Sequence, residues 1–171
     1  MMEPDIQHGA ATTTAIYPGS FDPVTYGHLD IIERAVQHFD RLVVAVFDRP
    51  NRRLRFSGAQ RLALMREATA HLTRVDVQQY HTLTVDYARV IGARVIVRGL
   101  RSPADFAAEQ PIAQHNRVMA PDIETFFLIA SPHHAACSAS IVREIAALGG
   151  DVAALVPPHV AAALRSAEYE P

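Results

Sequence analysis

The alternation of strand-like and helix-like segments is the feature of this sequence that most constrains its fold. Short β-branched or apolar runs are repeatedly followed by segments in which apolar residues recur at helical spacing. Leu42–Phe47, for example, is a continuous apolar run bounded by charge, which is typical of a buried parallel strand. The five expected strands lie at 12–17, 42–47, 75–79, 95–97 and 126–130.

Strands that alternate with helices indicate βαβ units, a parallel sheet and helices on both of its faces. We therefore predict an α/β fold of the Rossmann-like, doubly wound kind, built on a five-stranded parallel sheet. In such open sheets, ligands bind at the carboxyl ends of the strands, near the point where the strand order reverses. Residues that follow directly after strands are accordingly the first candidates for a functional site.

Polar residues at fixed spacing mark where several helices begin. Ser57 followed by Gln60 has the spacing of a capping box and opens a helix expected over 59–71. Thr84 is expected to cap a short helix over 85–91.

Length and composition fit one globular domain. The 171 residues are 49% apolar and 20% charged, which argues against disorder. Residues 1–12 are polar and lack the apolar stretch of a signal peptide. We expect a disordered N-terminal arm over 1–12 and a single domain over 13–171.

Charge and cysteine content argue against several classes of protein. The formal net charge of -2 provides no global basic field for nucleic acid. No apolar stretch approaches the ~18 residues of a membrane span. Cys137 is the single cysteine, so an intrachain disulfide is excluded and a reducing, cytoplasmic compartment is expected. The nine histidines lack the spacing of a zinc site, so we expect no metal held by the protein alone.

Two groups of residues suited to phosphate chemistry follow predicted strands. After the first strand, Gly19 permits close approach of the backbone to a ligand, and Ser20 adds a hydroxyl. His28 lies at the start of the next helix, where backbone N–H groups attract phosphate. After the fourth strand, the run 98–101 (Arg-Gly-Leu-Arg) supplies two guanidinium forks.

A third cluster spans Cys137–Arg143, where Ser138 or Ser140 is expected to cap a helix and Arg143 follows one turn later. Hydroxyls and backbone N–H groups at a helix start form a cradle for anions. Each of the three clusters also has a plainer interpretation as a turn, a surface ion pair or a simple cap. Their common position after strands favours one phosphate-binding site.

The run Tyr17–His28 resembles the signature of the nucleotidylyltransferase superfamily, whose short motif is His or Thr, any residue, Gly and His. That motif is Thr25–His28 here, and the longer run is similar to the phosphopantetheine adenylyltransferase version. Arg98–Arg101 matches that family's most distinctive motif, which related cytidylyltransferases lack. The resemblance runs from Ala15 to about Leu164 and includes Asp105-Phe106, Glu109 and Asn116-Arg117.

The resemblance implies transfer of AMP from ATP to 4'-phosphopantetheine, with release of pyrophosphate and formation of dephospho-coenzyme A. It also implies Mg²⁺ carried mainly by ATP, feedback inhibition by coenzyme A, and a homohexamer. The implied catalytic residues are His28, Arg52 and Ser20. The residues implied for phosphopantetheine are Ser20, Arg52, Thr84 and Arg98. The residues implied for ATP are Ser20, Phe21, His28, Gly99, Leu100, Arg101, Glu109, His134, Ala135, Ala136, Cys137, Ser138, Ala139 and Ser140.

Four residues depart from the family pattern. Arg52 stands where the family has an active-site lysine, Ala139 replaces a usual serine, and Ala108 replaces a usual tyrosine. Pro111 falls inside a segment that the family keeps helical. Because proline removes a helical hydrogen bond, we predict a kink or break there that moves Glu109 out of the nucleotide site.

Two other functions remain open at this point. The chain would be a nucleotidylyltransferase for another phosphorylated acceptor, such as nicotinamide mononucleotide, if it shared only the motif at 25–28. It would be a diverged, non-catalytic nucleotide-binding oligomer if the four departures had abolished turnover.

Overall fold

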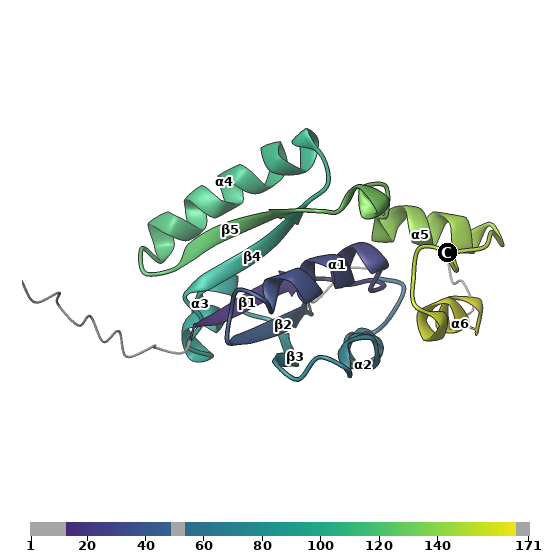
Figure 1. The fold of residues 1–171 in the computed structure, drawn as a ribbon, viewed down its shortest axis with the longest axis horizontal. Coiled ribbons are helices and arrows are strands. Elements are labelled where there is room, and N and C mark those ends of the chain that lie inside the picture. The colour runs from purple at the N-terminus through teal and green to yellow at the C-terminus, as the bar shows by residue number, and fades with distance from the viewer. Residues whose placement is uncertain (1–12, 49–53, 167–171) are drawn as a thin grey trace, which may run out of the picture.

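The strands form one parallel sheet in the order β3-β2-β1-β4-β5 (Figure 1). The computed structural model describes residues 13–48 and 54–166, and within them it contains five strands. The predicted α/β, Rossmann-like fold is therefore confirmed. The strands are β1 (Thr14–Gly19), β2 (Arg41–Phe47), β3 (Val75–Tyr80), β4 (Val95–Leu100) and β5 (Glu124–Ile129).

The strand order reverses between β1 and β4, which lie side by side although two further strands separate them in the chain. The chain runs outward from β1 through β2 to β3, and then returns to begin β4 on the other side of β1. The carboxyl ends of β1 and β4 therefore form the switch point, where a ligand site is expected in this class of fold.

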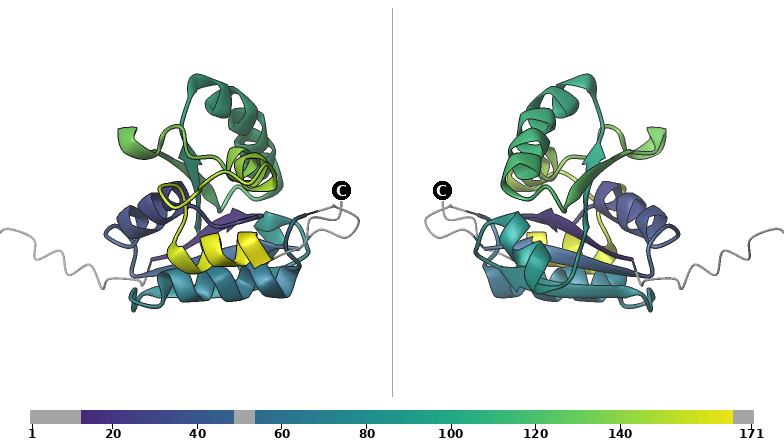
Figure 2. Two further views of the ribbon diagram at one scale, coloured as in Figure 1. Left: turned by 90° about the vertical axis from the view of Figure 1, so that its right-hand side faces the viewer. Right: turned by 90° about the vertical axis from the view of Figure 1, so that its left-hand side faces the viewer.

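The sheet is covered on both faces because side chains along each strand alternate between them. The larger core lies against α1 (Tyr26–Ala35), α2 (Gly58–Thr69) and α6 (Pro158–Ser166), and it includes the side chain of Tyr17. The neighbouring Ile16 belongs to a smaller core against α3 (Thr84–Val90). Figure 2 shows α6 running beside α2.

The helix α4 (Pro103–Met119) lies against β4 and β5 at one edge of the sheet (Figure 1). The predicted break at Pro111 is wrong, because α4 continues without interruption from Pro103 to Met119. Proline does deprive the Ala107 carbonyl of its helical donor. Ala107 and Pro111 are exposed, however, so water can take the place of the missing bond without a buried unpaired group.

The predicted N-cap at Thr84 is wrong. Leu83 is the N-cap of α3, and within the described residues no side chain makes a cap hydrogen bond there. The Thr84 hydroxyl instead lies 3.0 Å from the Tyr80 hydroxyl at the end of β3. A threonine hydroxyl that finds a side-chain partner in the preceding strand is no longer directed at the helix start.

The predicted caps of α2 and α5 are confirmed, and α4 has a cap as well. Ser57 and Gln60 make a reciprocal capping box at the start of α2. Ser102 accepts a hydrogen bond from the Asp105 N–H at the start of α4. Ser138, and not Ser140, caps α5 (Ala139–Ala147) by accepting from the Ile141 N–H.

Candidate active site

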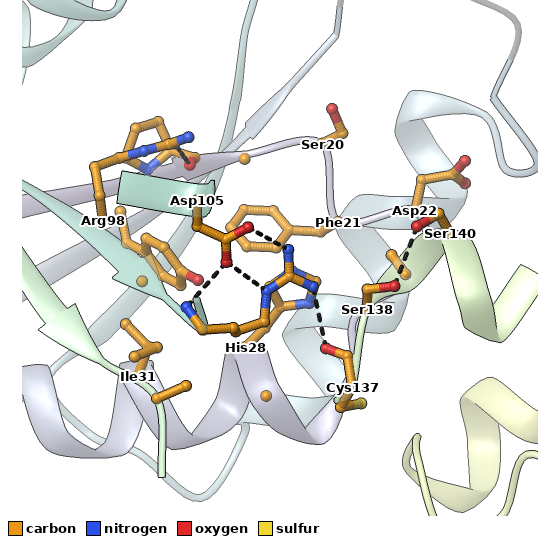
Figure 3. A pocket seen from close by; sticks show the side chains of 18 of the residues that line it. Ser20, Phe21, Asp22, His28, Ile31, Arg98, Asp105, Cys137, Ser138 and Ser140 are labelled. Carbon is orange, nitrogen blue, oxygen red and sulfur yellow. Dashed lines mark hydrogen bonds and ion pairs between the residues drawn. The ribbon is translucent and has the colours of Figure 1, made fainter. Parts of the chain in front are cut away.

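A cavity of about 380 Å³ opens at the carboxyl ends of β1 and β4, at the switch point of the sheet. Its wall combines the β1–α1 loop, the end of β4, the first half of α4 and the start of α5 (Figure 3). All three residue clusters suited to phosphate therefore meet in one place, as their positions after strands predict.

The β1–α1 loop is held in a fixed shape by Phe21. This residue is buried and has φ of 48°, in the left-handed region. Its ring packs edge-to-face between Tyr17 and His28, with centroids 5.3 and 5.1 Å away. Gly19 makes this possible, because a Cβ there would lie 2.8 Å from the Phe21 ring.

The same loop is tied to the start of α2 through Asp22. Its buried carboxylate accepts hydrogen bonds from the backbone N–H groups of Arg55 and Phe56, each at 2.9 Å. The carbonyl of Asp22 accepts from Arg143 of α5. The loop is thus fixed from two sides before any ligand binds.

His28 is presented as a neutral hydrogen-bond donor. The backbone N–H of Thr25 donates to its Nδ1 at 3.1 Å, so Nδ1 carries a lone pair and the proton resides on Nε2. Burial, followed by the nearby charges of Arg101 and Arg98, lowers the pKa of His28 to about 4. At neutral pH the ring therefore offers an N–H group without a positive charge of its own.

Arg98 and Glu109 form a two-pronged ion pair between β4 and α4. The Arg98 Nε donates to Oε2 of Glu109 at 2.8 Å, and its Nη2 donates to Oε1. The remaining Nη1 donates to the Pro18 carbonyl at 2.7 Å. Continuous helix on both sides of Pro111 thus keeps Glu109 at the cavity, which corrects the expectation that it would be displaced.

Arg101 joins the end of β4 to the approach to α5. Its Nε donates to Asp105 at 3.0 Å, and its backbone N–H donates to the same carboxylate at 2.9 Å. Its Nη1 lies 3.5 Å from the Cys137 carbonyl (Figure 3). The guanidinium is about one third exposed, so it faces the open cavity while held on one side.

The start of α5 forms another part of the cavity wall and supplies hydroxyls and backbone N–H groups to it. The hydroxyls of Ser138 and Ser140 lie 3.1 Å apart. Figure 3 shows the two side chains joined by a dashed line. Gly27 lies close to the segment before α5, because a Cβ there would approach the Cys137 carbonyl to 3.3 Å. With Arg143 alongside, this wall can receive a polyanion.

The structure brings most of the predicted site residues together. Those that line the large cavity are Ser20, Phe21, His28, Arg98, Gly99, Arg101, Glu109, Cys137, Ser138, Ala139 and Ser140. As far as the described residues define its wall, four predicted ATP residues do not line it, namely Leu100, His134, Ala135 and Ala136. Thr84 lines a second cavity of about 250 Å³ that shares Ser20 and Arg98 with the first. Arg52 and the N-terminal arm at 1–12 lie outside the described residues.

Several cavity residues escaped prediction as site residues. Asp22 reads as a turn residue, because its buried contacts with the backbone of Arg55 and Phe56 lie more than thirty residues away in sequence. Tyr17 reads as a strand residue, since the sequence does not show that its ring packs against Phe21 beside the cavity.

The sequence places Arg143 only in the anion cradle and Asp105 only within the family resemblance. The signal for Asp105 was its place in the first turn of a helix that starts directly after Arg101, where its carboxylate can reach back to the Arg101 backbone N–H and side chain.

Within the described residues, no group of three or more His, Cys, Asp or Glu side chains is arranged to hold a metal ion. The carboxylates that line the cavity are already engaged, since Asp22 accepts backbone N–H groups and Asp105 and Glu109 pair with arginines.

No helix in the described parts of the chain is long and apolar enough to cross a membrane.

A Rossmann-like sheet with cations, hydroxyls and helix N-termini at its switch point is suited to binding the phosphates of a nucleotide. The family model described as Cytidylyltransferase-like matches residues 16–145, so the chain belongs to the nucleotidylyltransferase superfamily. A solved structure described as a putative nicotinate-nucleotide adenylyltransferase from Vibrio parahaemolyticus has the same fold, with a TM-score of 0.65. It covers 91% of this chain and 100% of that one at 17% identity, so it informs the fold alone.

Curated relatives narrow the class to one family. A phosphopantetheine adenylyltransferase of Roseiflexus sp. (strain RS-1) is 57% identical over 155 residues, covering 91% of this chain and 97% of the relative. Another, from Gloeobacter violaceus, is 51% identical over 152 residues, covering 89% and 94%. The chain belongs to the phosphopantetheine adenylyltransferase family.

Proposed function

We propose that this protein transfers AMP from ATP to 4'-phosphopantetheine, forming dephospho-coenzyme A and pyrophosphate. The observation that carries the proposal is the meeting of His28, Arg98, Arg101 and the α5 start around one cavity at the switch point. The family relatives support the choice of acceptor. Pyrophosphate release measured with ATP, Mg²⁺ and a panel of phosphorylated acceptors tests it.

The reaction needs no covalent intermediate. An oxygen of the phosphopantetheine phosphate attacks the α-phosphorus of ATP, the bond from that phosphorus to the bridging oxygen breaks, and pyrophosphate leaves with the electron pair. The attacking phosphate is already anionic, so no strong base is required. Catalysis then consists of aligning two polyanions and stabilising charge at the α-phosphate.

His28 stabilises the transition state in this proposal. Its Nε2–H donates to an α-phosphate oxygen as charge builds on it, and the Thr25 N–H holds the ring in the tautomer that can donate. Ser20 and Arg52 position the attacking phosphate, although Arg52 lies outside the described residues.

Phosphopantetheine occupies the second cavity in this proposal. Thr84, Tyr80, Ile112 and Asn116 line it, and they combine apolar surface with hydrogen-bonding groups suited to an amide-containing arm. Its phosphate lies toward the large cavity, where Arg98 belongs to both walls.

ATP occupies the large cavity, with its phosphates between His28, Arg101 and the start of α5. The proposed adenine and ribose contacts are Gly99, Leu100, Glu109 and the segment 134–137. Mg²⁺ enters as part of the Mg–ATP substrate, because the carboxylates of the described cavity are already paired. It neutralises the charge of the departing pyrophosphate.

We further propose a homohexamer in the cytoplasm that coenzyme A inhibits. Large apolar side chains of α4 and β5 are exposed in the single chain, including Val118 at 80% and Ile129 at 73%. An exposed apolar surface of this kind favours association between copies. Coenzyme A contains the phosphopantetheine arm and would compete for the second cavity.

A further inference from the structure

Arg61 of α2 is an unusual residue for its position. Its side chain is 1% exposed, and it heads the fully buried side chains of the described residues by volume. It does not belong to the described wall of either cavity. Burying a guanidinium costs free energy unless its N–H groups are hydrogen-bonded. The hydrogen-bond partners of Arg61 therefore indicate its role.

Those contacts reach the carboxyl ends of two neighbouring strands. Its Nη1 donates to the carbonyls of Ser20 and Phe47, each at 2.8 Å. Its Nε donates to the Phe56 carbonyl at 3.2 Å, and its Nη2 pairs with Asp48 at 2.9 Å. One side chain therefore connects the loop after β1, the end of β2 and the segment that leads into α2.

Ser20 and Phe47 both line the second cavity. Ser20 also belongs to the wall of the first cavity, whereas Phe47 does not belong to its described wall. Arg61 binds the carbonyls of these two residues from behind the cavity wall. The orientation of each backbone at the acceptor end of the site is thus set by the same planar group.

The surroundings of Arg61 are arranged around its charge. Asp48 also accepts from the Gln79 amide at 2.7 Å, which orients the carboxylate. Gly58 leaves room for this pair, because a Cβ there would lie 2.7 Å from Asp48 and 2.8 Å from Gln79. A lysine at position 61 would keep the charge opposite Asp48 but could not span three carbonyls with one rigid fork.

We propose that Arg61 is a positioning residue for the acceptor half of the site. It holds the backbone of Ser20 and Phe47 so that the phosphate of the acceptor is aligned for attack. The inference rests on the proposed function, which assigns the second cavity to phosphopantetheine. It predicts a defect in the use of phosphopantetheine that is larger than any defect in the binding of ATP, because Phe47 lines only the second of the two cavities.

The test compares Arg61→Lys with Arg66→Lys, a control on the same helix. Arg66 donates only to the Val77 carbonyl in the described structure and lies outside both cavities. Steady-state kinetics of pyrophosphate release should give Arg61→Lys a KM for phosphopantetheine raised about tenfold and a kcat lowered about threefold or more. Its KM for ATP should stay within about twofold, and Arg66→Lys should match the wild type throughout.

Asp48→Asn provides a second variant in case Arg61→Lys does not fold, as judged by circular dichroism. It weakens the ion pair that holds the Arg61 guanidinium, so the bonds of that guanidinium to the carbonyls are less firmly oriented. The KM for phosphopantetheine should therefore rise about two- to threefold. Folded variants with an unchanged KM for phosphopantetheine, or with equal rises for both substrates, would overturn the positioning role. A wild type that releases no pyrophosphate with phosphopantetheine would instead refute the proposed function.

Discussion

The backbone N–H of Thr25 lies 3.1 Å from Nδ1 of His28, and this single bond determines which ring nitrogen can donate to a ligand. The same pair forms the capping box of α1, because the Thr25 side chain accepts from the His28 N–H. One local motif therefore starts the helix, orients the imidazole and leaves its Nε2–H for the cavity.

His28→Ala should lower kcat about 10²–10³-fold, which is typical for loss of one preorganised donor to a developing charge. Binding of ATP and the folded structure should be largely kept. Kinetics and calorimetric ATP titration measure the two properties separately, and His71→Ala on the exposed surface is the matched control. A His28→Ala enzyme with near-normal turnover would reduce His28 to a helix-capping residue.

The low pKa of His28 predicts a dependence of stability on pH. The folded pKa is about 4 and the unfolded value is 6.5, so between them the unfolded chain binds a proton that the folded chain does not. The free energy of unfolding should therefore decrease as the pH is lowered through this window. At pH 5 it should be about 2 kcal/mol smaller than at pH 7.5. Urea unfolding of the wild type and His28→Asn tests this, since the variant lacks the effect; equal losses on acidification in both proteins would contradict it.

Arg98→Ala should raise the KM for phosphopantetheine at least tenfold, equivalent to about 1.4 kcal/mol. The substitution also leaves the half-buried Glu109 without its partner, so unfolding should require about 1–3 kcal/mol less. Arg89→Ala is the control, because Arg89 also pairs with a carboxylate, that of Asp122, but on the exposed surface. Similar effects of the two substitutions on KM would exclude Arg98 from the acceptor site.

Arg52→Ala should lower kcat/KM at least tenfold, and Arg52→Lys should retain or improve kcat. A lysine ammonium is compact and can follow charge as it moves in the transition state, whereas a guanidinium is a broad planar fork. Arg53→Ala, one residue away, should matter less. Arg52 lies outside the described residues, so kinetics on the three variants is the direct test. An Arg52→Ala enzyme with normal kcat/KM would remove this residue from the site.

The sequence predicts the fold and the location of the site because these depend on local patterns. Apolar runs and helical spacing gave the five strands, and the positions after β1 and β4 gave the cavity. The strand β4 nevertheless extends to Leu100, so Arg98 and Gly99 lie within the strand and not after it. From sequence alone, charged residues and glycine at the end of a strand are assigned to a loop. Their pairing with a neighbouring strand, here β5, becomes visible only in the structure.

Features that depend on distant partners could not be predicted in this way. Arg61 lies on the side of α2 that meets Ser20, 41 residues earlier, and its sequence neighbours give no sign of that contact. Pro111 was expected to break α4, yet exposure of Ala107 lets the helix continue. In both cases the result depends on whether a group is buried or exposed. Tertiary packing determines that burial, and local sequence patterns do not show it.

The acceptor preference of the wild type tests the central claim most directly. Pyrophosphate release should be followed with ATP and Mg²⁺ while the acceptor is either 4'-phosphopantetheine or nicotinamide mononucleotide. We predict a kcat/KM for phosphopantetheine at least 10³-fold higher, because only that acceptor can use the second cavity together with Arg98. Equal or faster turnover with nicotinamide mononucleotide, or no turnover with either acceptor, would contradict the account.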